Sequence, residues 1–96
     1  MNQHFSLKKI HQKELEQLDG WYLDKKAIAK AFTFSSFNEA IEFINAVALF
    51  AEKRNHHPEI NIDFNKVSLS LTTKDCDGLT EKDFVLAKEI DTLIKK

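Results

Sequence analysis

The sequence predicts an α+β fold: a four-stranded antiparallel sheet with three helices on one face, in the order α-β-β-α-β-β-α. Two segments alternate apolar and polar residues with a period of two, as half-buried strands do. Three others repeat apolar residues at three- and four-residue steps, as amphipathic helices do. With 96 residues, the chain has the length of one domain, residues 1–96, built around a single core.

The first predicted element is a helix over residues 6–18, which Ser6 can cap and Gly20 can end. Two strands are expected next, at residues 21–23 and 28–34. In the second of these strands the apolar side chains share one parity, although Lys30 interrupts it.

The longest helix is predicted to follow Ser36 and Glu39, which form a capping-box pattern. Its apolar stripe consists of Phe37, Ala40, Ile41, Ile44, Val47, Ala48 and Ala51. Phe43 and Phe50 lie off this stripe, so the helix has a second apolar side that either joins the core or contacts another subunit.

A β-hairpin is predicted over residues 60–71. A two-residue turn at Asn65 and Lys66 would place six apolar side chains on one face, in the pairs Phe64 with Val67, Ile62 with Leu69 and Ile60 with Leu71. After a loop at residues 74–79, Thr80 and Asp83 indicate the start of a last helix. Its stripe consists of Phe84, Ala87, Ile90, Leu93 and Ile94.

Composition excludes several classes of function. A net charge of −1 argues against a basic surface for nucleic acid. No segment approaches the roughly 18 apolar residues that a membrane-spanning helix needs. The N-terminal residues lack the apolar stretch of a signal peptide, and Cys76 is the single cysteine, so we expect a cytoplasmic protein.

Residues 52–58, Glu-Lys-Arg-Asn-His-His-Pro, are the most informative stretch of the chain. Histidine is the side chain whose unperturbed pKa, about 6.5, suits proton transfer near neutral pH. Pro58 disfavours helical backbone at His57, so the long helix should end near Asn55 and present both histidines to the next strand. Glu52 lies one helical turn before His56, where its carboxylate can orient an imidazole.

Simpler explanations exist for each of these residues. Histidines at a helix end often only cap the helix or lie on the surface. A metal site that adds Cys76, His4 or His11 to the pair has no recognised ligand spacing, so none is expected. Trp21 fits the core better than a ligand platform, and Asp83 is explained as a helix-start residue.

Further residues repeat the spacing of a known family. They are the Glu-Lys-x-x-His-His-Pro run, Phe64, Asn65-Lys66-Val67, Thr72-Thr73, Cys76, Gly78-Leu79 and Asp83, together with Gly20-Trp21, Phe32-x-Phe34 and Phe37. With these residues the chain resembles the pterin-4a-carbinolamine dehydratases along essentially its whole length. The resemblance implies dehydration of 4a-hydroxytetrahydrobiopterin to quinonoid dihydropterin, which recycles tetrahydrobiopterin. It also implies no metal or organic cofactor, and a homodimer or homotetramer.

The resemblance also assigns roles to residues. His56 is the first acid–base candidate, His57 and Pro58 line the pterin, and Glu52 supports the catalytic pair. The loop formed by Thr73, Lys74, Asp75 and Cys76 would close over the pterin ring, and Trp21 would pack near the pocket.

Lys74 departs from the family pattern, because many relatives carry a third histidine or a tryptophan there. Lysine has a reference pKa of about 10.4, so it suits proton donation to the leaving oxygen better than proton removal. Alternatively, Lys74 takes no part and His56 acts alone. Activity is therefore expected, at a full or a reduced level. The alternative function is a non-catalytic interaction or assembly module, which exposed Phe43 and Phe50 would favour.

Overall fold

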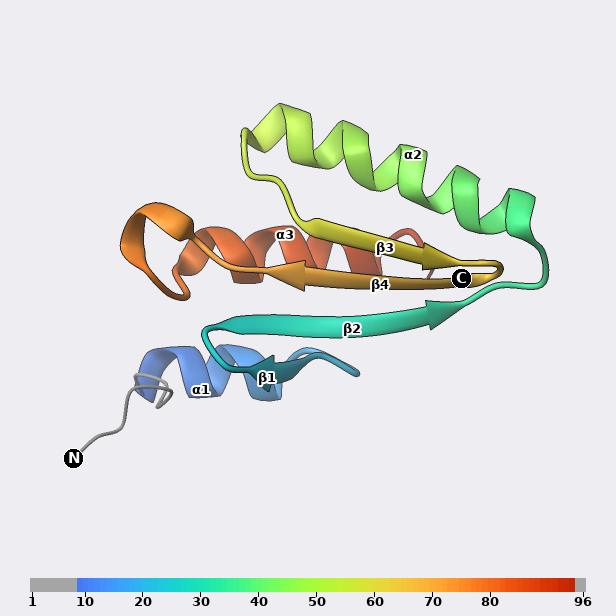
Figure 1. Ribbon diagram of the computed structural model, residues 1–96. Helices are drawn as coiled ribbons and strands as arrows, with labels where there is room; N and C mark the ends of the chain where they lie inside the picture. Colours follow the sequence, from blue (N-terminus) through green and yellow to red (C-terminus); the bar gives the residue numbers. More distant parts are fainter. Residues whose placement is uncertain (1–8, 95–96) are drawn as a thin grey trace.

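Four antiparallel strands form one sheet in the order β1-β2-β4-β3 (Figure 1). The computed structural model describes residues 9–94 and confirms the predicted fold class. Its elements are α1 (Lys9–Glu16), β1 (Tyr22–Asp24), β2 (Ala27–Thr33), α2 (Phe37–Arg54), β3 (Glu59–Asp63), β4 (Lys66–Leu71), the short 3-10 helix η1 (Lys74–Cys76) and α3 (Glu81–Asp91).

The core lies between one face of the sheet and the helices. The sheet contributes Ile28, Phe32, Val67, Leu69 and Leu71, and the helices contribute Ala40, Phe43, Val47, Phe84, Leu86, Ala87 and Ile90. Along β2 and β4 these side chains alternate with polar or small residues, which explains why one sheet face stays uncovered. Within the described residues, no helix is long and apolar enough to cross a bilayer.

The first helix ends at Glu16, two residues earlier than predicted. Gly20 follows with a φ of 87°, a backbone conformation that suits glycine, and leads into β1. The proposed cap, Ser6, lies outside the described residues.

The predicted hairpin register was wrong by two residues. Ile62 pairs with Val67 and Ile60 with Leu69, so the turn consists of Phe64 and Asn65. Phe64 has a φ of 56° and an exposed side chain, so five apolar residues share the core face, not six. A two-residue shift keeps every remaining side chain on its face, and therefore the alternation alone could not fix the turn.

The long helix begins at its predicted cap, because Ser36 Oγ accepts a hydrogen bond from the Glu39 backbone N–H at 3.1 Å. Its buried residues are Ala40, Phe43, Val47 and Ala51. Phe43 lies 4.8 Å from Phe32, between ring centroids, so it belongs to the core and not to a second face. The predicted stripe was therefore rotated relative to the buried one, and Ala48 and Phe37 are exposed.

Candidate active site

The end of α2 places the two histidines. Asn55 adopts a left-handed conformation, φ 52° and ψ 44°, and its N–H bonds to the carbonyl oxygens of Ala51 and Glu52. The His56 N–H also bonds to Ala51 O, at 3.0 Å. These bonds satisfy helix carbonyl groups and reverse the chain. The predicted end of the helix near Asn55 is thus confirmed, and both imidazoles lie at the entry to β3.

His56 is held by a buried carboxylate from a distant part of the sequence. Its Nε2 lies 2.6 Å from Asp83 Oδ1, and the exposed fractions of the two side chains are 11% and 0%. Because a carboxylate accepts hydrogen bonds, neutral His56 carries its hydrogen on Nε2. The pair thereby fixes the ring orientation and leaves Nδ1 as the second, basic nitrogen.

Asp83 is bound on its other oxygen as well. Oδ2 accepts hydrogen bonds from the Thr73 hydroxyl and the Thr80 backbone N–H, both at 2.9 Å. The Thr73 hydroxyl has one hydrogen, so Thr80 Oγ1, 2.7 Å away, donates to it. This carboxylate caps α3 and also joins α3 to the connection between β4 and η1 and to the α2–β3 junction.

The second histidine has a different environment. His57 Nε2 lies 2.8 Å from Glu52 Oε2, and both side chains are largely exposed. Glu52 thus orients an imidazole, as expected, but that of His57. The two histidines face different surroundings, as residues in extended backbone do.

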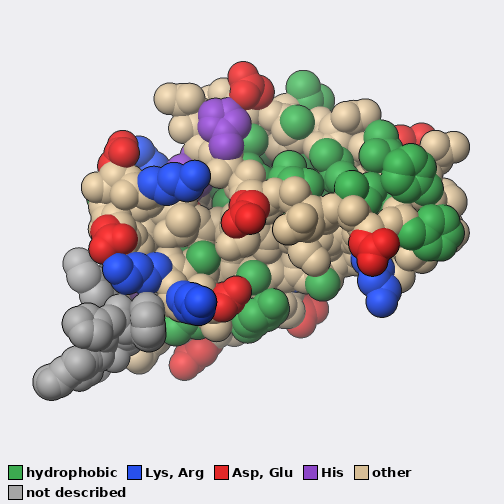
Figure 2. Space-filling model, in the orientation of Figure 1, with side chains coloured by type: hydrophobic (Ala, Val, Ile, Leu, Met, Phe, Trp, Pro, Cys, Tyr) green, Lys and Arg blue, Asp and Glu red, His purple; other side chains and the backbone are tan. Residues whose placement is uncertain are grey.

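A hollow of about 320 Å³ lies beside these groups. It is lined by Asn55, His56, His57, Thr72, Thr73, Lys74, Asp75 and Lys82. The structure therefore brings together five residues that the sequence placed in the site, namely His56, His57, Thr73, Lys74 and Asp75. Figure 2 shows histidine side chains (purple) next to lysine or arginine side chains (blue) near the end of α2, and a group of hydrophobic side chains (green) at the opposite end of the molecule.

Four other predicted site residues lie outside the lining. Glu52 reaches the site only through His57, and Pro58 is half-buried at the start of β3. Cys76 is exposed on η1. Trp21 is 5% exposed, and its Nε1 donates to both carboxylate oxygens of Asp91 at 3.1 Å, so it is a core residue.

Sequence reasoning did not place Asp83, Lys82, Asn55 or Thr72 in the site. Asp83 had been assigned to the helix start alone, and that assignment is also correct. Lys82 has no periodicity or motif that marks it, and only the fold brings it beside His56. Among residues 9–94, no group of three or more His, Cys, Asp or Glu side chains is placed to hold a metal ion.

Comparison with known proteins gives a consistent result. The family described as "Pterin 4 alpha carbinolamine dehydratase" matches residues 4–93. A protein of Sulfurisphaera tokodaii, whose name assigns it provisionally to pterin-4-alpha-carbinolamine dehydratase, is 44% identical over 92% of this chain and 99% of its own length. A similarly named protein of Aquifex aeolicus is 42% identical over 88% of this chain and 86% of its own length.

Two solved structures share the fold. A "transcriptional coactivator/pterin dehydratase" from Brucella melitensis superposes with a TM-score of 0.87 at 34% identity, covering 93% of this chain and 98% of its own. A pterin dehydratase-like protein described as a RuBisCO assembly factor in the α-carboxysome superposes with a TM-score of 0.67 at 26% identity, covering 78% and 89%.

Proposed function

This chain belongs to the pterin 4 alpha carbinolamine dehydratase family, and we propose that it dehydrates 4a-hydroxytetrahydrobiopterin to quinonoid dihydropterin, recycling tetrahydrobiopterin. The observation that carries the proposal is the His56–Asp83 pair at the wall of the hollow. Histidine is the general acid–base group best matched to neutral pH, and a buried carboxylate fixes its tautomer.

The reaction breaks the bond between C4a and its hydroxyl oxygen. A proton delivered to that oxygen lets it leave as water with the bonding electron pair, and a ring N–H proton is lost to restore neutrality. No electron acceptor or other reactant is required. Two titratable groups beside the carbinolamine carbon suffice, and His56 and His57 both line the hollow.

We assign His56 to the proton transfers, with Nδ1 directed to the substrate and Nε2 held by Asp83. His57, oriented by Glu52, lines the pterin and supplies the second group. Thr73, Lys74 and Asp75 line the same hollow, and Pro58 and Cys76 directly follow the lining residues His57 and Asp75 in the sequence. Lys74 takes the place of a family histidine as a proton donor to the leaving oxygen. Trp21 is left out because it is buried against Asp91.

The direct test follows dehydration of the enzymatically generated carbinolamine by wild type, His56→Ala and Lys74→His. Removal of His56 should lower the rate by about 10²- to 10⁴-fold, the usual contribution of a general acid–base group. Lys74→His should raise the rate. His11→Ala is the matched control, since His11 packs against Phe84 outside the hollow. A wild type no faster than the spontaneous reaction would refute the proposal.

Self-association forms part of the proposal. β3 is an edge strand with all five residues exposed, and its Ile60 and Ile62 are 36% and 37% exposed. Unpaired edges favour pairing with another chain, so a homodimer or homotetramer is expected. The exposed free thiol of Cys76 suits a reducing compartment, the cytoplasm.

A second candidate function is a non-catalytic interaction or assembly module. It is supported by the assembly-factor description of one structural relative and by Leu49, which is 73% exposed on α2. Phe43 and Phe50 were expected to favour it, but Phe43 is buried and Phe50 is half-buried against the core, so they give it no support. Partner binding that survives His56→Ala in a protein with no dehydratase activity would favour this function over catalysis.

A further inference from the structure

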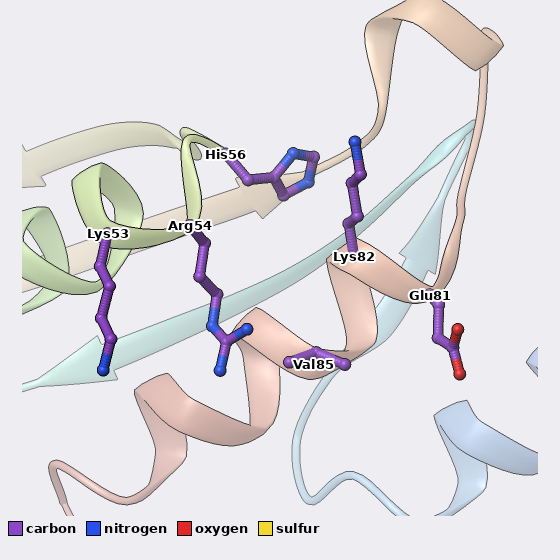
Figure 3. A pocket seen from close by; sticks show the side chains of 6 residues that line it. All are labelled: Lys53, Arg54, His56, Glu81, Lys82 and Val85. Atoms are coloured by element: carbon purple, nitrogen blue, oxygen red, sulfur yellow. The ribbon is translucent and has the colours of Figure 1, made fainter.

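A second hollow, of about 350 Å³, lies between the end of α2 and the start of α3 (Figure 3). It is lined by Lys53, Arg54, His56, Glu81, Lys82 and Val85. His56 and Lys82 also line the candidate active site, so the two hollows adjoin at these residues. The proposed reaction gives the second hollow no role.

The charge of this second hollow is predominantly positive. In Figure 3, Lys53 and Arg54 extend side by side from α2, the Lys82 ammonium lies near the His56 ring, and the Glu81 carboxylate points away from all three cations. Arg54 Nε is bound to Glu89 at 2.6 Å, which offsets part of its charge. The side-chain ammonium groups of Lys53 and Lys82 make no hydrogen bond or ion pair among the described residues, although Glu89 attracts Lys53 over a longer distance. The N-terminus of α3 adds the positive end of its dipole.

The chemistry of a pterin connects the two hollows. The reacting carbon, C4a, is joined through N5 to C6, which carries the side chain of the pterin. If the pterin ring presents C4a to His56, its side chain at C6 must also begin close to His56, where the two hollows meet. Beyond this point the side chain would pass Lys82 and reach Arg54 and Lys53.

We propose that the second hollow binds a negatively charged pterin side chain, so that the preferred substrates are pterin carbinolamines bearing a carboxylate or phosphate. The inference rests on the proposed dehydratase chemistry and extends its substrates from biopterin, whose side chain is neutral, to anionic pterins. Exposed charge pairs are weak individually, so two or three cations together predict a preference of about tenfold over a neutral side chain. This preference should decrease as salt concentration rises.

The test compares dissociation constants, measured by fluorescence titration at low salt, for three unreactive ligands. Dihydrobiopterin has a neutral side chain, dihydroneopterin monophosphate carries phosphate, and dihydrofolate carries carboxylates. Wild type should bind at least one anionic ligand about tenfold more tightly than dihydrobiopterin. Which of the two is favoured identifies phosphate or carboxylate as the recognised group.

The variants are Lys53→Gln and Arg54→Gln, with Lys88→Gln as an exposed lysine control on α3 outside both hollows. The readout is the ratio of affinities for anionic and neutral ligands on the same variant. A smaller fraction of folded protein affects both affinities equally and therefore does not change their ratio. Each hollow variant should reduce the ratio at least twofold, and Lys88→Gln should preserve it.

A wild-type ratio near one, or a ratio unchanged in both hollow variants, would overturn the inference while leaving the proposed function intact. Failure of all three pterins to bind would overturn both.

Discussion

α3 carries a hydrogen-bonded aspartate near each end. The two differ in whether the side chains that they bind remain accessible to a ligand. Asp83, fully buried, binds His56, Thr73 and the Thr80 N–H. Asp91, whose side chain is 13% exposed, binds Trp21 and Lys30. Each aspartate thus joins the last helix to distant parts of the chain.

Both partners of Asp91, Lys30 and Trp21, make their contacts inside the fold. Lys30 Nζ donates to Asp91 at 3.0 Å and to the Asp19 carbonyl oxygen at 2.6 Å, and it lies over the Phe32 ring. Trp21 is buried. His56, by contrast, gives one ring nitrogen to Asp83 and lines two hollows. A buried carboxylate therefore contributes to chemistry only where its partner keeps a reactive atom accessible.

The largest effect expected from this difference is that of Asp83→Asn on activity. The amide nitrogen is excluded from the Oδ2 position, because two donors face it there, so it takes the Oδ1 position and donates to His56 Nε2. Neutral His56 is then forced into the tautomer with hydrogen on Nδ1 and loses the basic nitrogen that the proposed mechanism uses. We expect kcat to fall about 100-fold or more, measured as carbinolamine dehydration at neutral pH.

Asp91→Asn is the matched control, because it makes the same change at the other end of α3. Its activity per folded molecule should equal that of wild type. Equal losses of activity in the two variants would remove the distinction between the two aspartates.

The second-largest expected effect is a loss of stability in Asp91→Asn. Asp91→Asn leaves the Lys30 ammonium mostly buried without its counter-charge, which should cost about 2–3 kcal/mol of unfolding free energy. For a domain of this size the Tm should fall by about 10–20 °C. Asp19→Asn serves as control, since Asp19 contributes only its backbone carbonyl to Lys30. A thermal melt of Asp91→Asn that matches wild type would show that the pair is not structural.

The fold was largely predictable because its signals are local and repeated. Alternation, capping pairs and Pro58 fixed the type and order of the elements without knowledge of their contacts. The hairpin register at Phe64 could not be predicted, since a two-residue slip keeps the alternation of apolar and polar residues. The buried stripe of α2 could not be predicted either, since a small rotation of the helix keeps most of its apolar spacing.

The candidate site was only half predictable. The Glu52-to-Pro58 run is contiguous, so its histidines could be recognised. Asp83 lies 27 residues from His56 and had a sufficient local explanation as a cap. Lys30 looked like an interruption in a strand, although it lies on the core face because Asp91 meets it there. Pairings between distant elements carry no periodic signal, and only the folded chain shows them.

Thr73→Val tests whether stability and activity require all three hydrogen bonds to the Asp83 carboxylate. The change removes one hydrogen bond from Asp83 Oδ2 and the acceptor for the Thr80 hydroxyl, while valine keeps the β-branched shape. We expect a loss of about 1–2 kcal/mol of unfolding free energy. Activity should fall less than in Asp83→Asn, because His56 keeps its tautomer. Thr73→Ser keeps the hydroxyl and should recover most of both. If serine and valine behave alike, the hydroxyl has no role.

The smallest effect comes from a third paired carboxylate on α3, Glu89, which shows what such a pair contributes near solvent. The hydrogen bond from Arg54 lowers the pKa of Glu89. A lowered pKa adds stability above the pKa of the unfolded side chain, about 4.3, and this stability is lost as pH falls through the folded value. Glu89→Gln should therefore lower the Tm by at most about 3 °C at pH 6–7. The difference from wild type should shrink as the pH falls below about 4.3.

Tm measured from pH 3 to pH 7 tests this expectation, with Glu42→Gln as an exposed glutamate control on α2. Because the pair lies at the surface, added salt should also reduce the difference at neutral pH. A deficit in Glu89→Gln that stays constant from pH 7 to pH 3 would mean that Glu89 acts through packing and not through its charge. The comparison of Glu89 with the two aspartates as paired carboxylates would then fail.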